Sequence, residues 1–173
     1  AEVQREPLSF LRIDRAETQF PDDVDTYDTK VYAKAKELLD DMIKDGSFII
    51  EDAPCYYLYE LTMEGRSQTG IVACSDVDDY QDQKIKKHEN TREDKELDRI
   101  RHVDVTDAQT GPIFLVYRSM QEINDIVAQS KEQTPLYDFT SADDITHRVW
   151  CISDQAVTAK LQGIFAGIPC TYI

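Results

Sequence analysis

A short segment of an otherwise acidic chain collects the side chains best suited to bind an anion. Residues 84–102 contain seven Lys or Arg, five Asp or Glu and two of the three histidines, in a 173-residue chain of net charge −15. We call this segment the basic island. A local excess of cations in an acidic chain indicates an anion-binding surface.

The second half of the basic island is expected to form a helix from about residue 92 to residue 104. Thr91 is the predicted N-cap, and good helix formers follow it. At about 100° per residue, four side chains share one basic face. They are Arg92, Lys95, Arg99 and His102. The apolar residues Leu97, Ile100 and Val103 are expected to form the buried side.

Two residues with acid–base chemistry precede this helix. His88 and Glu89 lie in the chain that enters the helix N-terminus, where backbone N–H groups and the helix dipole favour an anion. The arrangement predicts a phosphate or carboxylate site, with His88 and Glu89 available to transfer protons at its edge.

The same charges fit a second interpretation, a solvated helix covered with ion pairs. Arg92–Glu96, Asp98–Arg101 and Asp98–His102 have the required spacing. Each such pair contributes only about 0.2–0.5 kcal/mol. Composition alone slightly favours this second interpretation.

No metal site is expected. Arg92 stands where a helical zinc motif would need its second histidine. The four cysteines are far apart in the sequence and include no Cys-x-x-Cys pair, which favours buried free thiols. They are Cys55, Cys74, Cys151 and Cys170. His147 and Cys151 are four apart, about 13 Å along a strand, which is too far for a thiolate–imidazole pair.

The elements that must position the basic island alternate between helices and short strands. Asp28 can cap a helix that Gly46 ends, and the aromatic run 55–61, the turn Glu64-Gly65 and residues 68–73 form a hairpin pattern. Other strands are expected at 8–13, 112–117, 136–139 and 145–152, and other helices at 120–129 and 154–166. The pattern predicts an α+β fold with a mixed or antiparallel sheet and four helices.

Length and charge limit the classes of protein to which the chain can belong. Its 173 residues suit a single domain, expected to span 1–173. No apolar run is long enough to cross a bilayer, and no secretion signal is visible, so we expect a cytoplasmic protein. A pI near 4.5 argues against nucleic acid as a partner. Cofactors and oligomeric state stay unassigned.

The basic island also carries a family signature. The run from Ile85 to His102, followed by Gly111-Pro-Ile-Phe-Leu-Val-Tyr117, resembles the family known as domain of unknown function 1015. Leu8-Ser-Phe-Leu-Arg12 and Gln68-Thr-Gly-Ile-Val-Ala73 are similar to its pattern as well. The resemblance carries over a His-Glu-x-Thr signature and the Lys/Arg helix after it. Its residues are His88, Glu89, Thr91, Arg92, Lys95, Glu96 and Arg99.

The resemblance implies a longer protein with a shared site. Family members extend further at both ends and continue into an Ala-Asp-Gly-His-His-Arg segment, similar to a box of the ParB and sulfiredoxin-like group, which includes phosphate-handling enzymes. The chain is therefore expected to be a fragment that holds half of a site for a small anionic metabolite. The alternative is a non-catalytic module whose basic helix binds an acidic partner. A chromosome-partitioning role has no support from the acidic charge.

Overall fold

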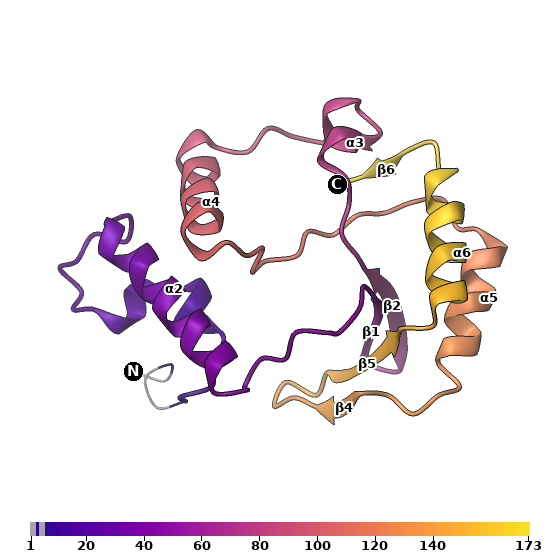
Figure 1. Ribbon diagram of the computed structural model, residues 1–173, viewed down its shortest axis with the longest axis horizontal. Coiled ribbons are helices and arrows are strands. Elements are labelled where there is room, and N and C mark those ends of the chain that lie inside the picture. Colours follow the sequence, from indigo (N-terminus) through magenta and orange to yellow (C-terminus); the bar gives the residue numbers. More distant parts are fainter. Residues whose placement is uncertain (1–2, 4–5) are drawn as a thin grey trace. The chain divides into compact units, whose positions relative to one another are not determined.

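The computed structural model describes residue 3 and residues 6–173. These residues pack into two compact units (Figure 1). We call the first the helical unit, which runs up to Ile50 and includes Glu89–Phe114, and the second the sheet unit, which comprises Glu51–His88 and Leu115–Ile173. The chain has the expected α+β class, with the expected antiparallel sheet and hairpin.

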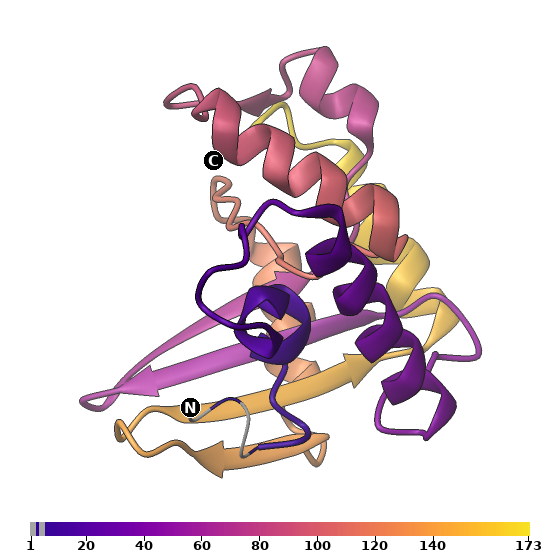
Figure 2. The same ribbon diagram turned by 90° about the vertical axis from the view of Figure 1, so that its left-hand side faces the viewer.

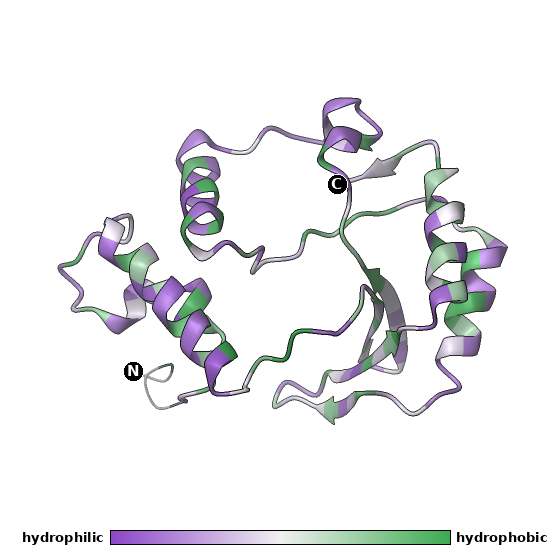
Figure 3. Ribbon diagram, in the orientation of Figure 1, coloured by the Kyte–Doolittle hydropathy of each residue, from purple (hydrophilic) through white to green (hydrophobic). Residues whose placement is uncertain are grey.

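The helical unit is built around α2 (Thr29–Lys44). Asp28 caps this helix by accepting a hydrogen bond from the backbone N–H of Lys30, and Gly46 follows it with a positive φ of 82°. Its apolar residues follow one side of the helix (Figure 3). The buried ones are Val31, Tyr32, Ala35, Leu38 and Met42.

Three further elements complete the helical unit. They are α1 (Leu11–Asp14), the 3₁₀ helix η1 (Ala16–Gln19) and α4 (Glu93–Thr106). Ile13 of α1 is fully buried against Leu38 and Met42 of α2, while Ala16 packs with Val31 and Ala35.

The strand predicted for residues 8–13 is wrong. The chain turns into α1 through hydrogen bonds from the N–H groups of Ile13 and Asp14 to the carbonyl of Phe10. Only Ile13 of its apolar side chains is buried, whereas Leu8 and Leu11 are exposed. A short apolar run is compatible with both the helical and the strand periodicity, and here packing of Ile13 against α2 favours the helix.

The sheet unit contains a four-stranded antiparallel sheet in the order β2-β1-β5-β4 (Figure 2). Its strands are β1 (Tyr56–Met63), β2 (Arg66–Val72), β4 (Tyr137–Thr140) and β5 (Thr146–Ile152). The expected turn joins β1 to β2, with positive φ at Glu64 and Gly65, as a two-residue hairpin loop requires.

Two helices cover one face of this sheet, α5 (Gln121–Ser130) and α6 (Gln155–Ala166). Asp154 caps α6 through the N–H groups of Ala156 and Val157. The core between sheet and helices is largely apolar. Its buried members are Leu58, Ile123, Ile126, Trp150, Ile152 and Leu161.

One buried charge interrupts this core. Glu60 of β1 is 3% exposed and accepts hydrogen bonds from Lys131 Nζ and from Thr69 Oγ1 at 2.9 Å. Thr69 and Arg148 are its cross-strand neighbours. The charge is therefore compensated from both adjacent strands and from the end of α5.

The remaining elements of the sheet unit are short. They are α3 (Val77–Gln81), β3 (Ile85–Lys86) and β6 (Thr171–Tyr172), with β3 and β6 paired in parallel. The strand predicted for 112–117 is wrong. Val116 makes only an isolated bridge to Tyr172, and Ile113 and Phe114 are exposed.

Candidate functional site

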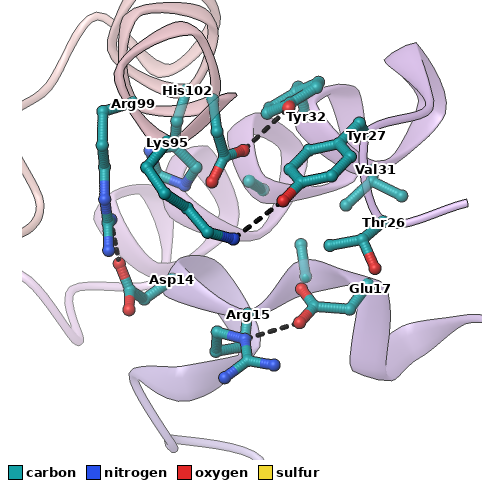
Figure 4. Close-up of a pocket in the computed structure, with 13 residues that line it drawn as sticks. Asp14, Arg15, Glu17, Thr26, Tyr27, Val31, Tyr32, Lys95, Arg99 and His102 are labelled. Carbon is teal, nitrogen blue, oxygen red and sulfur yellow. Dashed lines mark hydrogen bonds and ion pairs between the residues drawn. The ribbon is translucent and has the colours of Figure 1, made fainter. Parts of the chain in front are cut away.

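Within the helical unit, α4 presents three residues of the predicted basic face to one cavity. Lys95, Arg99 and His102 lie at helical spacing and line a cavity of about 360 Å³ (Figure 4). The opposite walls come from α1, η1 and the start of α2. The fold thus brings three of the four residues of the predicted basic face to one cavity.

Each of the two long cations is held by a residue from another segment. Lys95 Nζ donates to the hydroxyl of Tyr27 at 2.8 Å, which raises the pKa of Lys95. Arg99 Nη1 lies 3.2 Å from Asp14 Oδ1, and both contacts are visible in Figure 4. The cations are therefore positioned before any ligand arrives.

A tyrosine–carboxylate pair lies in the same cavity. Tyr32 donates a hydrogen bond to Asp98 Oδ1 at 2.8 Å. Burial, then the hydrogen bond and charge of Asp98, raise the pKa of Tyr32 to about 12. The hydroxyl is therefore protonated throughout the neutral range and acts as a donor.

The cavity is not uniformly positive. Arg15 Nε lies 2.5 Å from Glu17 Oε1 on its far side. Arg15, Lys95 and Arg99 are thus matched by three lining carboxylates, Asp14, Glu17 and Asp98. An anion would bind here by replacing Asp14 at Arg99 or by joining the hydroxyl of Tyr27 at Lys95.

His102 is buried, unlike the other members of the predicted basic face. Its Nε2 lies 3.2 Å from the carbonyl oxygen of Ile13. A carbonyl can only accept, so Nε2 carries the proton in this contact. His102 therefore links α4 to α1 and forms a wall of the cavity.

The residues predicted for the N-terminal end of the site do not line the cavity. Arg92, not Thr91, is the N-cap residue of α4, and its side chain makes no capping hydrogen bond. It pairs instead with Asp94 at 2.9 Å. Thr91, Arg92 and Glu96 are exposed and do not line the cavity.

His88 and Glu89 fall on either side of the boundary between the two units. Both are exposed, and neither lines the cavity. His88 Nδ1 lies 2.7 Å from the carbonyl oxygen of Ile173. Their proton-transfer role stays a prediction.

The buried side predicted for α4 is wrong. Leu97, Ile100 and Val103 are 46%, 50% and 37% exposed, while the buried residues of this helix are His102 and Thr106. The polar side packs inward because Ile13 and Tyr32 offer it partners for hydrogen bonds. An apolar stripe is left exposed on α4.

Sequence reasoning missed the residues that complete the cavity. Asp14, Tyr27 and Tyr32 lie more than sixty positions before their partners on α4. A single sequence carries no signal that joins them, because these pairs form only after α1 and α2 pack beside α4.

Comparison with known families identifies the chain. A family model described as "Protein of unknown function (DUF1015)" matches residues 1–173. The chain belongs to this family. The resemblance drawn from the basic island is thereby confirmed. No curated protein and no solved structure matches the DUF1015 chain.

The sheet unit of this DUF1015 chain has a cavity of its own, of about 390 Å³, between α5, the end of β5 and α6. Its charged lining residues are Asp154 and Lys160. Asp154 is already engaged as the cap of α6. This cavity is therefore the weaker candidate for an anion.

The cysteine expectation needs correction. Cys74 is exposed, and the other three are only partly buried. Cys55 and Cys151, far apart in the sequence, come close together in the sheet unit.

Among the described residues of the DUF1015 chain, no helix is both long and apolar enough to cross a membrane.

Proposed function

We propose that this DUF1015 chain forms part of an enzyme that binds a small carboxylated or phosphorylated metabolite in the cavity beside α4. The observation that carries the proposal is the placement of Lys95 and Arg99, one helical turn apart, on one cavity wall. Residues one helical turn apart have Cβ atoms about 5–6 Å from each other, so both side chains can reach the oxygen atoms of one carboxylate or phosphate group.

The surrounding groups support a small and polar ligand. Tyr27 offers a hydroxyl beside Lys95, while the hydroxyl of Tyr32 holds Asp98 by donating a hydrogen bond to it. A cavity of about 360 Å³ falls at the lower end of the range for small-molecule sites. Ligand specificity would come from the carboxylates, which repel a second negative group placed near Asp98 or Glu17.

The catalytic half of the proposal assigns proton transfer to His88 and Glu89. This role rests on the His-Glu-x-Thr signature alone, because neither residue lines the cavity. The binding half of the proposal can be tested without them.

Calorimetric titration with inorganic phosphate and sulfate tests the binding site. We expect Arg99→Ala and Lys95→Ala each to weaken binding about tenfold or more, the loss of one charge-assisted hydrogen bond. Arg92→Ala is the matched control, because Arg92 is equally cationic and lies next to α4 but outside the cavity. Equal losses in all three variants would refute the site.

The exposed stripe on α4 favours a second candidate, a non-catalytic module that binds an acidic partner through this helix. Leu97 and Ile100 would supply the apolar contact area, with the basic residues Arg99 and Arg101 beside Ile100 in the sequence. The substitution Ile100→Asp separates the two functions. Lost partner association with unchanged phosphate binding would favour the module.

A further inference from the structure

Three potential metal ligands converge in the sheet unit, outside the cavity beside α4. One ligand atom each from Glu51, Cys55 and Cys151 lies within 4.8 Å of the other two. Thiolate sulfurs and a carboxylate oxygen at such separations match the donor set of a tetrahedral zinc site.

The pairing of β1 with β5 produces this convergence. Tyr57 of β1 is the cross-strand partner of Cys151, and Cys55 stands two residues before Tyr57. Side chains two apart along an extended segment point to the same side, so Cys55 and Cys151 meet as diagonal neighbours. The ladder therefore holds Cys151 within β5 and Cys55 directly before the first residue of β1.

The third donor is oriented by a tyrosine. Tyr57 donates a hydrogen bond to Glu51 Oε1 at 2.5 Å. A carboxylate can accept that bond at one oxygen and bind a cation through the other, the usual arrangement around a protein-bound metal.

A divalent cation would favour loss of the thiol protons, because it stabilises both thiolates and the carboxylate together.

We propose that Glu51, Cys55 and Cys151 bind a thiophilic divalent cation of the zinc class. Binding would release the two thiol protons to solvent and give two sulfur ligands and one oxygen ligand. Three protein ligands leave a fourth tetrahedral position for water or a substrate atom. The proposal does not depend on the anion site, since all three residues belong to the sheet unit.

A disulfide between Cys55 and Cys151 is the competing outcome. It would account for two neighbouring sulfurs but would assign no role to Glu51 or to the Tyr57 hydrogen bond. The carboxylate within reach of both sulfurs therefore favours the metal.

Titration of the chain, kept reduced with a phosphine, with Co²⁺ followed by Zn²⁺ tests the proposal. We expect one Co²⁺ per chain, with thiolate-to-cobalt charge-transfer absorption and intense visible bands of a tetrahedral ion, all removed by Zn²⁺. Cys55→Ser and Cys151→Ser should each abolish the charge-transfer signal or halve its intensity. Glu51→Gln and Tyr57→Phe should weaken binding about tenfold or more. Cys74→Ser and Cys170→Ser are matched controls that should change nothing.

A second measurement uses the unaltered protein and so avoids any folding defect of the variants. Zn²⁺ should protect Cys55 and Cys151 from alkylation, located by peptide mass spectrometry, while the exposed Cys74 stays reactive. The proposal is overturned if the reduced chain binds no Co²⁺, if the Cys55 and Cys151 variants bind it as the parent chain does, or if Zn²⁺ protects neither thiol. Isolation of a Cys55–Cys151 disulfide that, once reduced, leaves a chain unable to bind metal would also overturn it.

Discussion

The hydroxyl of Tyr32 lies 2.8 Å from Asp98 Oδ1 and joins α2 to α4 across 66 positions of sequence. Tyr32 is almost fully buried. Its hydrogen bond therefore satisfies a polar atom that has little access to water, and it fixes the helix that carries Lys95 and Arg99. Packing and ligand geometry in the helical unit depend on the same contact.

Loss of this hydroxyl should destabilise the helical unit. We expect Tyr32→Phe to lower the free energy of unfolding by about 1.5–3 kcal/mol, because the bond goes to a charged carboxylate. Urea unfolding followed by circular dichroism measures the change. Tyr27→Phe is the control, since its bond to Lys95 is exposed and should contribute little to the free energy of unfolding. Equal effects in the two variants would contradict the assignment.

The buried pair of Lys131 and Glu60 should be the most sensitive polar contact of the sheet unit. Lys131→Met leaves the carboxylate of Glu60, which is 3% exposed, without its main cation. We therefore expect the free energy of unfolding to fall by about 3 kcal/mol. Fluorescence of Trp150, the single tryptophan of the chain, reports unfolding of this unit. Lys84→Met removes an exposed pair with Asp79 and should leave the free energy of unfolding nearly unchanged.

The same carboxylate predicts a loss of stability in acid. Burial alone would raise the pKa of Glu60, but hydrogen bonds from Lys131 and Thr69 outweigh it, and the pKa lies below its ordinary value of 4.5. The folded state thus binds fewer protons than the unfolded state. This contribution is complete above about pH 4.5 and is lost as the pH falls through the folded pKa.

Unfolding by urea at a series of pH values, read from Trp150, checks this sign. Glu60→Gln should be less stable than the parent chain at neutral pH, yet its stability should decline less steeply below about pH 4.5. An equally steep decline in both proteins would assign the acid sensitivity to other groups.

A helix and a strand at residues 11–14 predict different effects on stability when Leu11 and Ile13 are truncated. Leu11 and Ile13 would share one face of a strand and should then respond alike to truncation. In the structure Ile13 is fully buried and Leu11 is 50% exposed. We expect Ile13→Ala to cost about 2–4 kcal/mol and Leu11→Ala less than about 1 kcal/mol, measured by urea unfolding. Similar losses in both variants would favour the strand.

The sequence by itself determined the elements whose signals are local. Asp28 and Gly46 bound α2, Glu64-Gly65 places the hairpin turn, and Asp154 starts α6, because caps and positive-φ turns depend on residues only a few positions apart. It also located the basic island and the helix within it. Family membership followed from the same segment.

The tertiary structure alone decided which faces meet. The inward side of α4 is polar, since Tyr32 and the carbonyl of Ile13 supply partners that the sequence of α4 cannot reveal. The same holds for Cys55 and Cys151, which are brought together only by the register of β1 on β5. Periodicity reports which residues share a face, whereas burial of that face depends on a surface built by distant segments. For this reason the basic island was found in the sequence, but its cavity, its partners and the cysteine cluster appeared only in the folded chain.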